Sequence, residues 1–308
     1  MRIRATVVAA SGALALSALA LPSAQADDAA ASRADVVDIR EAAHAASSGD
    51  TAFSTAAAAA DEPYAMDVTF SNFKIASAIK VGTTNQVTVP VTYTMTHGAD
   101  VDITAGDFFT DPYIYKGSFD TPDNVLMGDE SATCTATSST TATCKGTIDV
   151  YPAYGDLINS DAGSWKGGAM AMAFNGQDPS SDSFDISQVG YADQGDLAST
   201  KVQRYSRLTV NASPEPVYKG RTLTATGKLT RANWETNTYK GYTNQPVKLQ
   251  FRKAGTSTYT TVKTVYSDAY GNVKATTTAN YDGYWRFRFE GTSTTPAVSA
   301  TGDYVDVR

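Results

Sequence analysis

The chain has 308 residues, a formal net charge of −7, and only two histidines and two cysteines. So few of these residues leave little material for histidine-based zinc sites or for cysteine–histidine catalysis. The composition is rich in Thr, Ser, Gly, Ala and Tyr, and it contains few long helix formers. This composition predicts an all-β protein built from many short strands rather than a helical bundle.

Residues 1–26 are predicted to be a signal peptide. Arg2 and Arg4 precede an apolar, Ala-rich run from Val7 to Leu21, and Ala24-Gln25-Ala26 fits a cleavage site. The run is too short for a spanning helix, and no later segment contains about 18 consecutive apolar residues. We therefore expect a secreted, extracellular protein without a membrane span.

Residues 27–63 are predicted to be a disordered, Ala-rich spacer. The segment consists largely of Ala, Ser and Asp, and residues 56–60 are all alanine. An isolated helix of this length is marginal in water, and few large apolar side chains are available to hold one in place. The segment is therefore a spacer or a removable pro-segment.

Residues 64–206 are predicted to form an acidic β-sandwich domain with 17 acidic and 7 basic residues. Alternation from Val87 to Met95 indicates a strand with one buried face, and Pro90 places that strand at a sheet edge or at a bulge. Other strands are expected at Met66 to Phe70, Pro112 to Lys116, Cys144 to Val150 and Ala169 to Phe174, where Met170, Met172 and Phe174 share a face. Acidic loops are expected at Asp178 to Asp185 and Tyr191 to Asp196.

Cys134 and Cys144 are predicted to form a disulfide. The sequence between them is nearly a palindrome about Ser139. A three-residue turn at Ser138 to Thr140 would place the two cysteines opposite each other on paired strands. An even pair of cysteines in an exported chain is expected to oxidise.

Residues 207–308 are predicted to form a basic β-sandwich, with 14 basic and 7 acidic residues and a net charge of +7. Apolar and polar residues alternate in Leu208–Ala212, Leu223–Leu229, Val247–Phe251, Val273–Ala275, Trp285–Phe289 and Tyr304–Val307. About seven strands in roughly 100 residues suit an immunoglobulin-like sandwich. The alternation assigns Phe251, Trp285, Phe287 and Phe289 to the core. The positive charge either keeps the domain soluble or attracts an anionic surface or the acidic neighbour, in a salt-sensitive way.

Three runs in this basic domain carry a family resemblance. They are Gly220–Gly227, Pro246–Arg252 and Asp282–Gly291, the last reading DGYWRFRFEG. Together they resemble the bacterial Ig-like modules of secreted actinomycete proteins, and residues 64–206 resemble an Ig-like sandwich through strand spacing alone. The resemblance implies binding, spacing or adhesive roles without catalysis, and it supplies no functional residue.

Two groups of residues in the basic domain are candidate ligand-binding residues. Trp234, Tyr239 and Tyr242 cluster in a stretch that is predicted to be irregular, where exposed rings would stack on sugars; alternatively, Trp234 packs under the loop as core. The second group occupies outward strand positions and forms a basic face if its strands are neighbours: Lys248, Arg252, Tyr284, Arg286 and Arg288.

Clustered loop aspartates in the acidic domain are a candidate calcium site. They are Asp178, Asp182, Asp185, Asp193 and Asp196. Calcium binds several flexible oxygen ligands, but the spacing does not match an EF-hand loop, so solvated turn aspartates are the alternative. No other cofactor is expected.

No catalytic constellation is visible in the sequence. Because His44 lies in the spacer, a Ser-His-Asp triad would depend on His97. We interpret His97 as a structural residue at a strand end, beside a turn glycine. Metalloprotease, P-loop and dinucleotide-binding motifs are not found in the sequence.

We therefore expect a secreted, non-catalytic binding or structural protein. Its basic domain would contact a cell-wall glycan or another anionic polymer, and nucleic acid is not expected as a partner. Two alternatives stay open. One is a protein-recognition module, such as an enzyme inhibitor or accessory subunit. The other is a hydrolase with a carboxylate site in the acidic domain.

Overall fold

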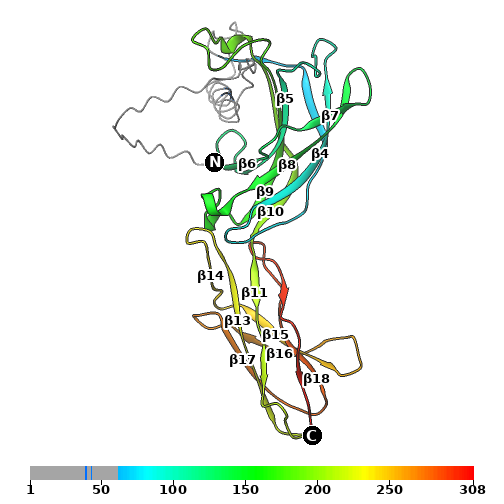
Figure 1. Cartoon of the computed structure of the whole chain (residues 1–308), viewed down its shortest axis with the longest axis vertical. Coiled ribbons are helices and arrows are strands. Elements are labelled where there is room, and N and C mark those ends of the chain that lie inside the picture. The colour runs from blue at the N-terminus through cyan, green and yellow to red at the C-terminus, as the bar shows by residue number, and fades with distance from the viewer. Residues whose placement is uncertain (1–38, 40–42, 44–61) are drawn as a thin grey trace, which may run out of the picture. The chain divides into compact units, whose positions relative to one another are not determined.

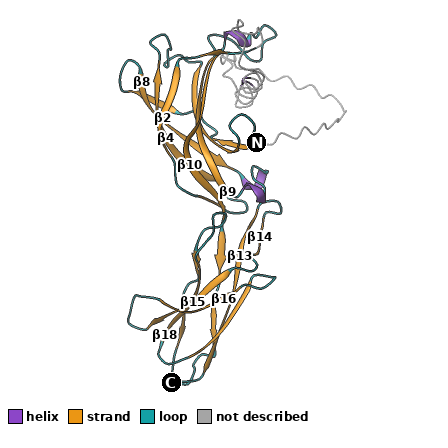
Figure 2. Ribbon diagram, turned by 180° about the vertical axis from the view of Figure 1, so that it is seen from behind, coloured by secondary structure: helices purple, strands orange, loops and turns teal. Residues whose placement is uncertain are grey.

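The computed structural model describes Ile39, Ala43 and residues 62–308 (Figure 1). The predicted signal peptide lies outside the described residues, as does the expected spacer apart from Ile39, Ala43, Glu62 and Pro63. Ile39 and Ala43 are helical, and Ile39 is buried. Strands and loops make up almost all of the described chain, which confirms the all-β prediction (Figure 2). Within this part of the chain, no helix is long and apolar enough to cross a membrane.

The chain divides into two compact units. The first contains the described residues up to Ile75, together with Pro90–Ile148 and Lys166–Ala198. The second contains Ala76–Val89, Asp149–Trp165 and Ser199–Arg308. Two segments that precede residue 199 in the sequence therefore belong to the same unit as the basic C-terminal residues.

Two sheets form the N-terminal sandwich. The 4-stranded sheet has the order β2 (Val68–Lys74), β4 (Val87–His97), β8 (Thr141–Val150), β7 (Thr133–Ala136). The 6-stranded sheet has the order β1 (Tyr64–Ala65), β10 (Gly190–Arg204), β9 (Gly163–Ala173), β5 (Phe108–Gly117), β6 (Pro122–Met127). β3 (Ile79–Val81) pairs with the last residues of β10, and these two segments belong to the second unit. Short 3₁₀ turns cover Pro152–Tyr154, Asn159–Asp161 and Ile186–Gln188.

Aromatic side chains join these two sheets. The Tyr93 hydroxyl on β4 lies 2.9 Å from the Thr110 hydroxyl on β5. Burial strongly raises the pKa of the Tyr93 phenol. The Phe73 ring on β2 lies so close to β9 that a Cβ added at Gly167 would be 2.8 Å from it. A glycine at this position therefore allows the sheets to approach each other closely.

The 6-stranded sheet is also buried on its other face. Tyr113, Tyr115, Met170, Met172 and Phe174 form one cluster with Ile39, Val189 and Tyr191. This cluster confirms that Met170, Met172 and Phe174 share a face. It also explains why β5 and β9 show nearly continuous burial instead of alternation.

Three expectations for the N-terminal sandwich were tested by its strand pairing. Cys134 pairs with Cys144 across β7 and β8, and their disulfide confirms that prediction. β4 as a whole lies inside its sheet, but its pairing with β2 runs from Thr92 to His97, so Pro90 lies beyond that pairing. The prediction of a loop at residues 191–196 was wrong, because these residues belong to β10. Their polar side chains are accommodated there by hydrogen bonds, such as the one that Asp193 accepts from Tyr191.

The C-terminal sandwich also has two sheets, coloured from yellow to red along most of their strands in Figure 1. In the first, β13 (Thr222–Asn233) pairs with β11 (Ser206–Leu208), β12 (Asn211–Ser213), β14 (Thr238–Gly241) and β17 (Asn272–Thr278). The second has the order β16 (Thr260–Tyr266), β15 (Pro246–Lys253), β18 (Gly283–Phe289), β19 (Val298–Ser299), and β20 (Asp303–Val305) also pairs with β18. Strands β14, β16 and β19 were not expected from the sequence.

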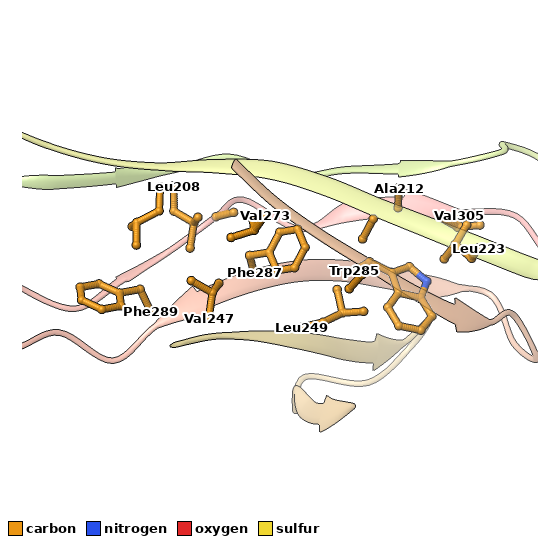
Figure 3. Packing of buried hydrophobic residues seen from close by; sticks show 14 of the residues in the cluster. Leu208, Ala212, Leu223, Val247, Leu249, Val273, Trp285, Phe287, Phe289 and Val305 are labelled. Atoms are coloured by element: carbon orange, nitrogen blue, oxygen red, sulfur yellow. The ribbon is translucent and has the colours of Figure 1, made fainter. Parts of the chain in front are cut away.

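The core of this sandwich follows the predicted alternation. Figure 3 shows the inward side chains of β15 and β18 facing those of the other sheet. The first group is Val247, Leu249, Trp285, Phe287 and Phe289, and the second is Leu208, Ala212 and Leu223. Trp285, Phe287 and Phe289 are all buried, and Phe251 packs against the cluster while remaining partly exposed. The side chains between these inward residues therefore point away from the core.

Candidate functional site

Antiparallel pairing of β15 with β18 assembles a single outward face. Lys248 pairs with Arg288, Gln250 with Arg286, and Arg252 with Tyr284. Residues that face each other across paired strands have their Cβ atoms within about 4.5–5.5 Å. The structure therefore brings the five outward candidates, Lys248, Arg252, Tyr284, Arg286 and Arg288, together on neighbouring strands.

Tyrosine rings stack against the guanidinium groups of the two arginines nearest one end of this face. The Arg286 guanidinium carbon lies 3.7 Å from the Tyr259 ring centroid, and the Arg252 carbon lies 4.0 Å from the Tyr284 centroid. Arg252 also lies 5.3 Å from Tyr259. Tyr304 on β20 meets Tyr284 edge-on with a centroid distance of 5.2 Å. We call Arg252, Tyr259, Tyr284, Arg286 and Tyr304 the arginine–tyrosine platform.

Neutral acceptors hold the platform arginines in place. Arg286 Nε donates to Gln250 Oε1 at 2.9 Å, and Arg252 Nη1 donates to the Thr256 carbonyl at 2.5 Å. A Cβ at Gly302 would collide with the Tyr259 hydroxyl, so this glycine allows the ring to lie where it does. Within the described residues, neither Arg252 nor Arg286 has a carboxylate within the 4.0 Å of an ion pair. Their positive charges are therefore available to a ligand.

The other end of the face carries its own anion. Glu290 pairs with Lys248 at 2.9 Å and with Arg288 at 3.0 Å. Hydrogen bonds from Arg288 and Lys248 lower the pKa of Glu290 to about 2, and the Glu290 carboxylate raises the pKa of Arg288 in return. The single negative charge of Glu290 therefore offsets one of the two positive charges of Lys248 and Arg288, and both side chains are engaged in ion pairs within the protein.

The aromatic group expected near residue 234 is arranged differently. These residues lie in or beside the β13–β14 hairpin rather than in an irregular stretch. Trp234 is buried, 2% exposed, and its indole nitrogen donates to the Gly82 carbonyl at 2.9 Å. Arg207 lies 3.5 Å over the Tyr239 ring. The Tyr242 ring lies 3.9 Å from Arg231 and packs against Phe289 of the core. Trp234 is thus core, and each tyrosine already has an arginine over its ring.

The loop aspartates bind groups of their own unit. Asp178 and Asp185 accept hydrogen bonds from Ser180 and Ser187, and these bonds lower the pKa of both carboxyls. Asp193 accepts from the hydroxyls of Tyr113 and Tyr191. Asp196 forms an ion pair with Lys166 at 2.6 Å. The Asp182 carboxylate makes no hydrogen bond or ion pair with the described residues. In the described part of the chain, no group of three or more acidic, histidine or cysteine residues is placed to hold a metal ion.

His97 is buried at the end of β4. Its Nδ1 lies 2.9 Å from the Gly98 carbonyl oxygen, and its Nε2 is buried without a hydrogen-bond partner among the described residues. A general base must lie within hydrogen-bond reach of the group that it deprotonates. Among the described residues, neither ring nitrogen of His97 is hydrogen-bonded to a side chain that it could deprotonate.

Four residues of the face were not identified from the sequence: Gln250, Tyr259, Glu290 and Tyr304. Gln250 and Glu290 occupy positions whose partners depend on how β15 pairs with β18. Tyr304 lies next to the inward Val305, so strand alternation would have placed it outward. Tyr259 comes from the loop before β16, where no periodic pattern indicates its position.

Comparisons with known proteins give only distant structural similarities. No protein family and no curated protein matches the chain in sequence. It is similar to the Yersinia pseudotuberculosis adhesin InvE (12% identity, TM-score 0.24), covering 76% of this chain and 58% of the adhesin. It is also similar to the D0-D1 domain of intimin (15% identity, TM-score 0.24), covering 77% of this chain and 98% of that one. A third similarity is to Dpr2 Ig1-Ig2 in complex with DIP-Theta (12% identity, TM-score 0.21), with coverages of 76% and 66%. The strand order and core of the chain itself define its fold.

Proposed function

We propose that the protein is a secreted, non-catalytic binding protein. In this proposal, the C-terminal sandwich contacts an anionic extracellular polymer such as a cell-wall glycan. The observation that supports it most is the β15–β18 register, which gathers four cationic side chains on one outward face: Lys248, Arg252, Arg286 and Arg288. The net charge of +7 over residues 207–308 adds a long-range attraction for polyanions. The Cys134–Cys144 disulfide is typical of oxidising, extracytoplasmic compartments.

Co-sedimentation of the mature chain with insoluble polymers tests this proposal. Peptidoglycan that retains its anionic polymers should bind the protein at low salt and release it at high salt, because salt screens exposed charges. Chitin, which is uncharged, should retain little protein. Replacing the four cations of the face with glutamine should abolish retention. No retention at low salt, or equal retention of the substituted protein, would overturn the proposal.

A protein partner is a second candidate because tyrosine and arginine are enriched at the centres of protein–protein interfaces. The arginine–tyrosine platform has that composition. A protein-recognition role predicts a stoichiometric complex in the extracellular medium and no retention on washed cell walls. Size-exclusion chromatography of the secreted protein in its native medium distinguishes this role from polymer binding.

A further inference from the structure

The cations of the outward face are not equally available. Arg252 and Arg286 have neutral hydrogen-bond acceptors, whereas Lys248 and Arg288 share the Glu290 carboxylate. A polyanion would gain full charge-assisted hydrogen bonds from the first pair. It would have to compete with Glu290 for the second pair. The platform end of the face is therefore the stronger anion site.

The two free guanidiniums are close enough to act on one ligand. Arg252 faces Tyr284, and Arg286 faces Gln250 one pair further along the same strands, so the two arginines are diagonal neighbours. The backbones of such diagonal neighbours are about 7–8 Å apart, so their long side chains can reach the same ligand. The Tyr259 ring lies beside both guanidiniums, 3.7 Å from the Arg286 carbon and 5.3 Å from the Arg252 carbon. Two like charges held this close repel each other, and an anion bound over both would relieve that repulsion.

The aromatic part of the platform adds a preference for ring-shaped ligands. Tyr304 is 42% exposed and lies against Tyr284, which in turn contacts Arg252. Tyrosine rings beside guanidiniums offer an apolar surface for the flat face of a sugar together with donors for its acidic group. A linear polyphosphate has no ring to place on Tyr304. The platform therefore fits an acidic polysaccharide better than a phosphate chain.

Negative charge near Tyr304 indicates how such a ligand would lie. Burial raises the pKa of the Tyr304 phenol, and the nearby carboxylates of Asp282 and Asp306 raise it further. Asp306 is ion-paired with Arg308 at 3.0 Å, whereas Asp282 accepts a hydrogen bond from the Val307 amide at 2.8 Å and has no ion pair among the described residues, so the Asp282 carboxylate repels an acidic group at the Tyr304 end. The acidic groups of a ligand are consequently favoured over Arg252 and Arg286, with a neutral sugar face on Tyr304.

We infer that the arginine–tyrosine platform binds a polysaccharide whose sugar rings carry carboxylates, and that Glu290 withholds Lys248 and Arg288 from that ligand. The inference rests on the proposed function, of which it specifies the ligand and the contact residues. Arg252 and Arg286 would hold the carboxylates, and the exposed Tyr304 ring would contact a sugar face, with Tyr284 supporting Tyr304 and Arg252 from beneath. Glu290 would act as an internal competitor that limits affinity.

Binding of the mature chain to three soluble polymers tests the inference. The polymers are polygalacturonate, polyphosphate and uncharged dextran, and affinity is measured at several salt concentrations. The unmodified protein should prefer polygalacturonate to polyphosphate and should not bind dextran. The R252Q/R286Q protein should bind polygalacturonate about tenfold more weakly or worse, because charged hydrogen bonds are lost.

Four further variants separate the contributions of the Tyr304 ring, of the overall positive charge and of the competing Glu290 carboxylate. Y304A should lower polygalacturonate affinity by about threefold to tenfold, whereas Y304F keeps the ring and should preserve it. E290Q should raise affinity by about threefold and steepen the salt dependence, because it releases Lys248 and Arg288. K219Q/R221Q removes two exposed charges elsewhere in the same unit and should change affinity much less than R252Q/R286Q.

The outcomes distinguish failure of this inference from failure of the proposed function. Equal binding of polyphosphate and polygalacturonate, with no effect of Y304A, would overturn the carboxylated-sugar ligand and leave polyanion binding in place. An E290Q protein with unchanged or weaker affinity would overturn the role of Glu290. No binding to either polyanion at low salt would overturn the proposed function as well. Melting temperatures of all variants show whether a loss of binding reflects a loss of folding.

Discussion

The two sandwiches use their charged residues in opposite ways. In the first, carboxylates are directed to groups of the same unit: Asp193 to tyrosine hydroxyls, and Asp196 to Lys166. In the second, Arg252 and Arg286 lie on the outward face without a carboxylate partner among the described residues. Both regions have a strong net charge in the sequence, but the candidate carboxylates of the first bind groups of their own unit, whereas Arg252 and Arg286 of the second keep their charge available to a ligand. Net charge alone therefore does not identify a binding surface.

Side-chain length accounts for much of this difference. A short aspartate in a loop reaches the backbone amide and hydroxyl two residues further on, as Asp178 does with Ser180. A long arginine on a strand instead lies across neighbouring side chains and keeps its guanidinium at the surface. Aspartate clusters thus tend to stabilise their own turns, whereas arginines on paired strands build a face.

The largest expected effect separates the two sides of β18. Phe287 is fully buried between the sheets (Figure 3). Its neighbour Arg286 lies on the opposite, outward face of β18. Phe287→Ala should lower the free energy of unfolding by about 3–5 kcal/mol, because it removes a core ring and leaves a cavity. Chemical denaturation monitored by fluorescence measures this change.

The matched control is the outward substitution Arg286→Ala. It should change unfolding much less than Phe287→Ala while weakening binding to polygalacturonate. If Arg286→Ala destabilised the protein as strongly as Phe287→Ala, the outward face would be a structural element of the sandwich. The contrast between the carboxylates of the first sandwich, which bind groups of their own unit, and the ligand-facing arginines of the second would then fail.

A second substitution tests the structural role of aspartate in the first sandwich. Asp193→Ala should lower the free energy of unfolding by about 1–3 kcal/mol, because the buried Tyr113 hydroxyl and the Tyr191 hydroxyl lose this acceptor. Asp193→Asn keeps an acceptor oxygen and should cost less. The melting temperature should be insensitive to added calcium in both proteins and in the unmodified chain. Stabilisation by calcium that disappears in Asp193→Ala would instead assign this carboxylate to a metal site.

Much of the C-terminal core could be predicted from the sequence, whereas the N-terminal sandwich was predicted less completely. Period-two alternation in Val247–Phe251 and Trp285–Phe289 correctly separated inward from outward side chains. Burial on both faces of β5 and β9 gave no such alternation, because a second cluster covers the outer face. The strand containing Asp193 was interpreted as a loop because its sequence is acidic and contains glycine. The partner that allows Asp193 to lie in a strand, Tyr113, is distant in the sequence and could not be predicted.

The candidate face was predictable in part for a different physical reason. Outward positions follow from local alternation, so Lys248, Arg252, Tyr284, Arg286 and Arg288 could be named. Which strands are neighbours depends on tertiary pairing, so the contact of Glu290 with both Lys248 and Arg288 could not be derived from the sequence. The loop residue Tyr259 is positioned by packing near Gly302 and the two arginines, which no local pattern encodes.

The smallest expected effect concerns Glu290 and pH. The pKa of Glu290 falls from its ordinary 4.5 to about 2 in the folded chain, because Arg288 and Lys248 donate to its carboxylate. A carboxyl with a depressed pKa contributes stability that is fully present above pH 4.5 and is lost as pH falls from about 4.5 to about 2. The group is 46% exposed, so solvent screening limits the contribution to about 0.2–1 kcal/mol.

Denaturation of the unmodified and E290Q proteins across this pH range measures the contribution of Glu290. The difference between their unfolding free energies should be small and constant above pH 4.5, and it should shrink as the pH approaches 2. Loss of this ion-paired carboxylate would barely change the fold, yet it would release two cations on the outward face. A difference that grew as the pH fell, or that reached the size expected for Phe287→Ala, would mean that Glu290 is a structural residue. Glu290 would then resemble the carboxylates of the first sandwich that stabilise their own unit.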